Sequence, residues 1–121
     1  MMKQLLLIAY IFLAQNFSVV AQEVIDSKGF DDTDGIVLIE FWEEWNKKND
    51  CSWLEEIEGV RSYRMKMSSN LAKEMEIKVL PTIVLFQKQE YINKWEGDIS
   101  FRLPLGTKKK VQDSVDKLNF K

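Results

Sequence analysis

The feature that most constrains the fold of this chain is an apolar segment, Ile36–Trp42, which contains a single acid, Glu40. The segment is rich in β-branched and aromatic residues, and Gly35 precedes it. A short apolar run that does not alternate with polar residues is typical of a strand buried on both faces. The sequence therefore predicts a central strand with other elements packed on each side of it.

Further strands are predicted on either side of this segment. Apolar and basic residues alternate through Tyr63–Met67, which favours a strand with one buried face. The runs Thr82–Phe86 and Tyr91–Glu96 predict two more strands, joined as a hairpin although the link lacks Asn-Gly or Asp-Gly. A weaker pattern places a first strand near Glu23–Ile25.

Helices are predicted between these strands. A short one is expected near Gly29–Thr33, and a second runs to Glu58, with a possible capping box at Ser52 and Glu55. Ser69-Asn70 is expected to cap a helix through Met75, and Thr107 to cap one whose apolar stripe ends at Leu118. The alternation predicts an α/β domain with a central mixed sheet of four to five strands and helices on both faces.

The N-terminal segment differs from the rest of the chain. After Lys3, an apolar run covers Leu5–Ala14, and small residues precede Gln22. This layout is typical of a secretory signal peptide. We therefore expect a signal peptide at 1–21 and one domain at 22–121, exported to the periplasm or secreted. An uncleaved anchor is the alternative, but the run is short of the ~20 residues that span a bilayer, so no stable membrane insertion is expected after cleavage.

Composition excludes several classes of function. The 17 basic and 19 acidic residues are interspersed and the net charge is -2, so no basic field attracts nucleic acid. Histidine is absent and Cys51 is the single cysteine, which excludes a Ser–His or Cys–His pair and a zinc site of such ligands. No metal or cofactor is expected. Cys51 is interpreted as a small buried hydrophobe, with a free or intermolecularly paired thiol as the alternative.

Three segments together resemble the thioredoxin family. Val37–Trp45 is similar to the strand that leads into the thioredoxin redox motif, and Val79–Phe86 to the segment with the cis-proline. Trp95–Gly97 is similar to the later segment whose glycine borders the substrate groove. The order and spacing of these segments also match, and the resemblance covers roughly residues 23–118. The resemblance implies a thioredoxin fold.

The resemblance breaks at the redox motif. Where the family has cysteine, glycine, proline and cysteine after Trp45, this chain has Asn46-Lys47-Lys48-Asn49. Disulfide exchange requires an attacking thiolate and a resolving thiol, and carboxamides supply neither. We expect Asn46 or Asn49 to cap the following helix instead. Lys47 and Lys48 are either simply solvated or form a small positive surface for an acidic partner.

The resemblance also implies roles for residues outside that motif. Glu40 stands where the family has a buried acid, and Arg64 on the neighbouring strand is expected to pair with it, unless Glu40 turns to solvent. The bond before Pro81 is expected to be cis. In the family, the backbone of the residue at Leu80 pairs with an extended substrate, so Trp45, Leu80, Pro81 and Gly97 are the expected binding surface.

The sequence therefore favours a binding domain over an enzyme. The first interpretation is an exported, redox-inactive thioredoxin-like domain that binds an extended peptide or a protein partner. The second is a single-thiol redox protein that acts through Cys51, and the third is a structural or dimerisation domain. Exposure of Cys51 near Pro81 would favour the second, and a large exposed apolar patch elsewhere would favour the third. The oligomeric state is left open.

Overall fold

The computed structural model describes residues 23–120. The predicted signal peptide, at 1–21, lies outside the described residues. Within residues 23–120, no helix is both long enough and apolar enough to cross a membrane.

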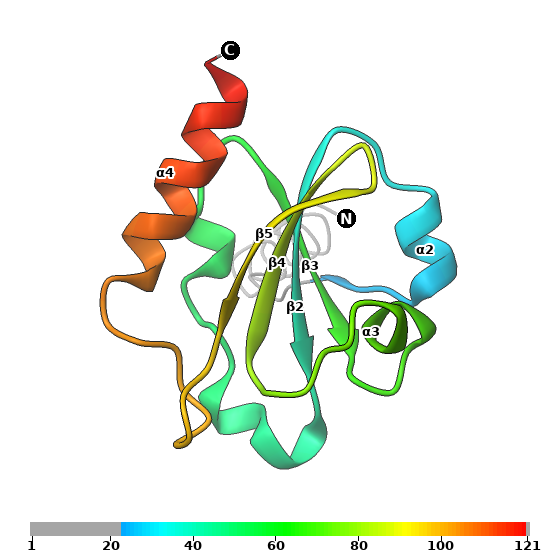
Figure 1. Cartoon of the computed structure of the whole chain (residues 1–121), viewed down its shortest axis with the longest axis vertical. Helices are drawn as coiled ribbons and strands as arrows, with labels where there is room; N and C mark the ends of the chain where they lie inside the picture. The colour runs from blue at the N-terminus through cyan, green and yellow to red at the C-terminus, as the bar shows by residue number, and fades with distance from the viewer. Residues whose placement is uncertain (1–22, 121) are drawn as a thin grey trace, which may run out of the picture.

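Five strands form one mixed sheet in the order β1-β3-β2-β4-β5 (Figure 1). The central strand β2 runs parallel to β3, which also pairs in parallel with β1. On its other side β2 pairs antiparallel with β4, and β4 and β5 form the predicted hairpin. The strand bounds are β1 (Glu23–Val24), β2 (Ile36–Trp42), β3 (Arg61–Lys66), β4 (Thr82–Gln87) and β5 (Glu90–Glu96).

Helices cover both faces of this sheet, as the sequence predicts. Figure 1 shows α2 (Ser27–Asp31) and α3 (Asn70–Glu74) on one face and α4 (Thr107–Asn119) on the other. Two 3-10 segments follow β2: η1 (Glu44–Asn49) and η2 (Leu54–Glu56). The predicted α/β class is confirmed.

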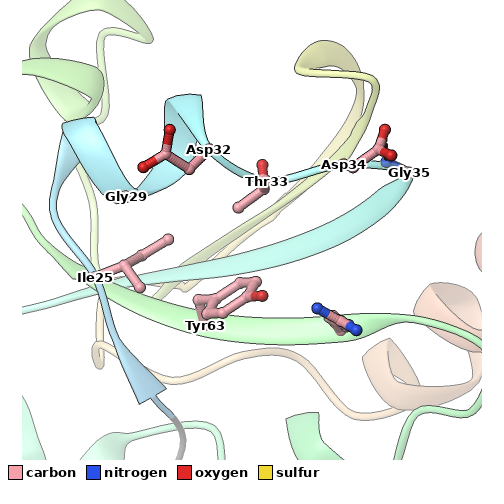
Figure 2. A pocket seen from close by; sticks show the side chains of 8 residues that line it. Ile25, Gly29, Asp32, Thr33, Asp34, Gly35 and Tyr63 are labelled. Carbon is pink, nitrogen blue, oxygen red and sulfur yellow. Dashed lines mark hydrogen bonds between the residues drawn. The ribbon is translucent and has the colours of Figure 1, made fainter.

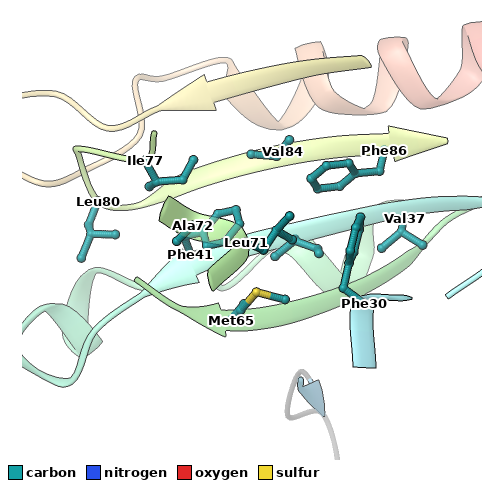
Figure 3. Close-up of a cluster of buried hydrophobic side chains, with 11 residues drawn as sticks. Phe30, Val37, Phe41, Met65, Leu71, Ala72, Ile77, Leu80, Val84 and Phe86 are labelled. Carbon is teal, nitrogen blue, oxygen red and sulfur yellow. The ribbon is translucent and has the colours of Figure 1, made fainter. Parts of the chain in front are cut away.

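The face under α2 and α3, which we call the α2/α3 face, is packed with apolar side chains (Figure 3). The Phe30 ring on α2 meets Phe86 on β4 with 4.7 Å between ring centroids and 60° between planes. The cluster comprises Phe30, Val37, Ile39, Phe41, Met65, Leu71, Ala72, Ile77, Leu80, Val84 and Phe86.

The opposite face, the α4 face, mixes apolar packing with buried charge. Its buried apolar cluster comprises Leu38, Cys51, Leu54, Ile57, Ile83, Leu85, Val111 and Val115. Side chains alternate along a strand, so Glu40 lies on the same side of β2 as Leu38. Glu40 is fully buried there.

Two of the predicted helix caps are wrong and one is confirmed. The segment expected to be a helix through Glu58 forms only short 3-10 turns, and no side chain caps η2, so the Ser52–Glu55 capping box is absent. The turn ends because the backbone of Ile57 is extended. Thr107 does not cap α4, since its hydroxyl donates to the Pro104 carbonyl at 2.6 Å. Ser69 does cap α3, by accepting from Ala72 N–H at 3.2 Å.

Candidate functional site

The predicted site residues gather where β2 and β3 end. Because β2 and β3 are parallel and β4 runs the other way, the end of β2 lies beside the start of β4 and the end of β5. The η1 segment, Leu80–Pro81 and Gly97 therefore share one edge of the sheet, at the bottom of Figure 1. We call this edge the motif end.

The two asparagines at the expected cysteine positions bind each other. Asn49 Nδ2 donates to Asn46 Oδ1 at 2.8 Å, and Asn46 is only 5% exposed. The prediction that one of them caps a helix is wrong. Asn46 lies inside η1, at a kink with φ −111° and ψ 16°, while the residue before η1 is Glu43, whose side chain makes no cap. The hydrogen bond between the two carboxamides therefore closes the η1 turn.

Cys51 follows this turn and is enclosed by the α4 face. It is 7% exposed and packs in the cluster with Leu54. Burial, and after it the nearby charge of Glu40, raise the pKa of the Cys51 thiol well above its ordinary value. The thiolate and not the thiol is the nucleophile, so burial at this position favours the less reactive form of the sulfur.

Glu40 lies beneath the same loop. Cys51 N–H donates to Glu40 Oε2 at 2.8 Å, and Arg64 Nε lies 3.8 Å from Glu40 Oε1, an ion-pair distance longer than a hydrogen bond. Arg64 also contacts the Asp50 carboxylate, and its guanidinium carbon lies 4.5 Å from the centre of the Trp42 ring. The structure therefore places Glu40 with Arg64 and adds Asp50, which the sequence analysis missed.

Burial dominates the titration of Glu40. It raises the pKa of this carboxyl from 4.5 to about 7, with a smaller opposing effect of the Cys51 N–H. The Asp50 charge adds to the rise and the Arg64 charge opposes it. Glu40 thus changes its charge near neutral pH.

Leu80, Pro81 and Gly97 lie together at the motif end. The Leu80–Pro81 bond is cis, and the Leu80 side chain is buried in the α2/α3 face. Gly97 N–H donates to the Pro81 carbonyl at 2.8 Å. A Cβ at position 97 would lie 2.6 Å from the Leu80 carbonyl oxygen, so only glycine fits there without a shift. Within residues 23–120, the backbone N–H and C=O of Leu80 have no hydrogen-bond partner.

Trp45 is at the same end but its ring contact is with Phe101. Trp45 is 60% exposed and meets the half-exposed Phe101 edge to face, with 5.2 Å between ring centroids. The loop that carries Phe101 also presents Ile99, which is 97% exposed. Asp98 shapes this loop, since its carboxylate accepts from Ser100 N–H at 2.8 Å. Phe101 was missed because a loop residue belongs to no periodic pattern.

A separate hollow lies at the other end of β2, where the strand begins. Its volume is about 520 Å³, and Figure 2 shows Tyr63 and Ile25 on one side with the Asp32–Gly35 segment on the other. The Asp34 carboxylate accepts from Gly35 N–H at 2.8 Å. None of the predicted site residues lines this hollow. Within residues 23–120, no group of three or more acidic or cysteine side chains is placed to hold a metal ion.

Comparisons with known proteins identify the fold. No protein-family model and no curated protein matches the chain. Among solved structures, a point mutant of thioredoxin from Halobacterium salinarum is 19% identical, with a TM-score of 0.60 over 80% of this chain and 88% of that one. Thioredoxin from Malassezia sympodialis is 24% identical, with a TM-score of 0.58 over 81% of this chain and 90% of that one.

A third similar structure comes from work on thiol resolution in the yeast mitochondrial 1-Cys peroxiredoxin by the glutathione and thioredoxin systems. It is 16% identical, with a TM-score of 0.57 over 82% of this chain and 96% of that one. At these identities the likeness concerns the fold alone. The chain has a thioredoxin fold that carries a single cysteine.

Proposed function

We propose that this chain is an exported thioredoxin-like domain without dithiol redox activity, which binds an extended polypeptide at the motif end. One observation carries the proposal. The positions of the two redox cysteines hold carboxamides that bind each other, whereas the backbone of Leu80 beside them is unpaired within the described residues. This combination supports a site that lacks the redox chemistry of the motif and can still bind a peptide through the main chain beside it.

The sulfur count and the burial of Cys51 support the proposed absence of dithiol redox activity. A dithiol reaction needs one thiolate to attack and a second thiol to resolve the mixed disulfide, and this chain has one cysteine. The pKa of Cys51 is raised by its enclosure in the α4 face. The protein therefore has no internal partner for a first disulfide and little thiolate to form one.

Peptide binding is supported by the geometry around Leu80. An extended peptide gains affinity when its backbone pairs with a free N–H and C=O, and specificity from neighbouring side chains. The Leu80 side chain is buried inward, so its backbone is the part that a ligand meets. Trp45 and Phe101 offer exposed rings at the same end, and aromatic surfaces of this kind are typical of binding sites.

The binding test uses the domain with its cysteine and asparagines intact. Fluorescent unfolded polypeptides are titrated into wild type, Trp45→Ala and Gly97→Val. Trp45→Ala removes a ring, and Gly97→Val places side-chain atoms against the Leu80 carbonyl. We expect each to weaken binding at least tenfold. The matched control is Phe120→Ala, which removes an exposed ring at the end of α4. Equal affinity in all four proteins, or dimerisation without peptide binding, contradicts the proposal.

A redox test asks whether this fold lacks disulfide-reducing activity only because its two cysteines are absent. Wild type is expected to reduce no disulfide substrate, whereas Asn46→Cys/Asn49→Cys is expected to gain turnover, since the two carboxamides already lie 2.8 Å apart. Turnover by wild type removes the claim of redox inactivity.

The single-thiol alternative rests on the Glu40 carboxyl beside Cys51, a potential proton acceptor. Its test is intact-mass analysis after incubation with oxidised glutathione. We expect no adduct on the native protein and one adduct on the protein unfolded in urea. A native adduct that a reductant removes in a catalytic cycle favours this alternative.

Export and the boundary after residue 21 belong to the same proposal, and they rest on the N-terminal pattern alone. The full chain is expressed in a Gram-negative bacterium, and the periplasmic fraction is sequenced from its N-terminus. We expect the protein to begin at Gln22. Retention of the full chain in the membrane fraction supports the uncleaved anchor instead.

A further inference from the structure

The core of the α4 face contains an incompletely paired group of polar side chains. Three side-chain atoms are buried without a hydrogen-bond partner among the described residues: Glu40 Oε1, Arg64 Nε and Trp42 Nε1. Buried polar atoms almost always have a partner, so such a group calls for an explanation. The three residues are neighbours, since Glu40 and Arg64 face each other across β2 and β3 and the guanidinium lies over Trp42.

This group is connected to the η1 loop, defined here as residues 43–51, at two successive positions. Asp50 contacts the Arg64 guanidinium, and Cys51 donates its backbone N–H to Glu40. The Asp50 N–H in turn donates to the Lys47 carbonyl at 3.1 Å, which closes the last turn of η1. The loop that carries Trp45 and the asparagine pair is therefore anchored to the sheet through Glu40 and Arg64.

We propose that Glu40, Arg64 and Asp50 form a pH-responsive latch, which holds the η1 loop on the sheet while Glu40 is protonated and loosens it when Glu40 ionises. Arg64 is a positioning residue in this latch, since it acts on the loop through the two carboxylates. The proposal concerns loop motion and holds whether or not the motif end binds a peptide.

The solvation of the Glu40 carboxylate explains why ionisation loosens the loop. An ionised Glu40 beneath the closed loop has one hydrogen bond, from Cys51 N–H, and its Oε1 is 3.8 Å from Arg64 Nε. A buried carboxylate with so few donors is costly, and water reaches it when the loop lifts. Protonation removes that cost, so the closed form binds the proton more tightly than the lifted form. By linkage, rising pH favours the lifted form.

Burial and, to a smaller extent, the charged groups around Glu40 set the midpoint. Arg64 on β3 and Asp50 on the loop are the charged side chains that act on it, and the Cys51 thiol lies beside it. The residues that β4 and α4 contribute to this cluster are apolar, namely Ile83, Leu85, Val111 and Val115. Burial places the pKa of Glu40 at about 7, so the latch changes state near neutral pH.

The experiment measures amide hydrogen exchange of Asn46 and Asp50, whose N–H groups donate to carbonyls within the loop. Protection factors, already corrected for the intrinsic pH dependence of exchange, are followed from pH 5.5 to 8.5. In wild type we expect protection to fall at least fivefold with a midpoint near pH 7. Glu40→Gln is expected to abolish this dependence. The matched control is Glu96→Gln, which removes a carboxylate paired with Lys94 on the exposed strand β5.

Two further variants test the latch even if Glu40→Gln fails to fold. Asp50 raises and Arg64 lowers the pKa of Glu40, so Asp50→Asn is expected to shift the midpoint to lower pH and Arg64→Gln to higher pH. The Trp42 indole N–H resonance is followed in parallel and is expected to shift with the same midpoint. Protection that does not depend on pH in wild type, or midpoints that move together in the two variants, overturns the proposal.

Discussion

The two faces of the sheet bury different kinds of side chain. On the α2/α3 face, 11 apolar residues form the buried cluster, and its one aromatic pair, Phe30 and Phe86, is in ordinary contact. On the α4 face, a comparable apolar cluster surrounds a carboxylate and borders a guanidinium. Apolar contacts are insensitive to pH, whereas a buried carboxylate is not. The first face therefore supplies stability, and the second makes stability and loop motion depend on protons.

The same contrast bears on function. Each predicted site residue lies at the motif end or on the α4 face, and only the side chain of Leu80 packs into the α2/α3 face. In this chain a buried acid, Glu40, lies beneath a loop that holds Asn46 and Asn49. The acid then affects the position of the loop and the stability of the fold.

The largest expected effect is on the α2/α3 face. Phe86→Ala removes a buried ring that contacts Phe30, and we expect a loss of about 3–5 kcal/mol in the free energy of unfolding. The loss should be the same at pH 5 and pH 8, since the contact that is removed joins two apolar rings. Urea denaturation at both pH values measures it. Phe120→Ala, an exposed ring, is the control and should change stability by less than about 0.5 kcal/mol.

On the α4 face, a substitution is expected to raise the free energy of unfolding rather than lower it. The pKa of Glu40 is about 7 in the folded protein against an ordinary 4.5, so the folded state binds the proton more tightly. Stability through this group is fully present below pH 4.5 and is lost as pH rises to about 7. Glu40→Gln should therefore stabilise the fold by up to about 3 kcal/mol at pH 8 and have little effect at pH 4.5.

Urea denaturation across this pH range is the measurement, with Glu96→Gln as the control for removal of a surface carboxylate. If Glu40→Gln destabilises the protein equally at both ends of the range, the two faces do not differ in the way described here.

Much of the fold follows from the sequence because burial on both faces leaves a readable pattern. The run Ile36–Trp42 predicted the central strand, and Thr82–Phe86 predicted its antiparallel neighbour. The η1–η2 segment was predicted as a helix because Trp53, Leu54 and Ile57 have helical spacing. Tertiary contacts override that spacing, since Cys51 N–H is bound by Glu40 and Ile57 is extended.

Local backbone conformation explains other differences. The hairpin between β4 and β5 turns at Lys88 and Gln89, which have φ of 51° and 67°. Left-handed conformations are usually taken by glycine or asparagine, so the sequence offered no turn signal. At the site, Asp50 and Phe101 were missed for a related reason. Both lie in loops, and the residues they contact, Arg64 and Trp45, are distant in sequence and brought near only by the fold.

Substitution of Cys51 is expected to cause a smaller loss of stability. This loss tests how tightly the α4 face is packed around the sulfur. If the residue acts only as a buried hydrophobe, Cys51→Ala should cost about 1 kcal/mol, through lost packing against Leu54 and its neighbours. Cys51→Ser should cost more, about 2 kcal/mol, because it places a hydroxyl in an apolar cluster. Thermal unfolding ranks the two variants. A serine variant as stable as wild type means that the sulfur position is wetter than its 7% exposure indicates.

The smallest effect is expected at the asparagine pair, which closes the turn at the motif end. Asn49→Ala leaves the buried Asn46 Oδ1 without its donor, and the loss should be about 1 kcal/mol. Lys48→Ala, at the exposed neighbouring position, is the matched control and should be neutral. Adding Asn46→Ala completes a double-mutant cycle. Because each single variant already breaks the hydrogen bond, the double variant should cost less than the sum of the two. Strict additivity would mean that the carboxamides act separately, and the turn would then be held by the Asp50–Arg64 contact instead.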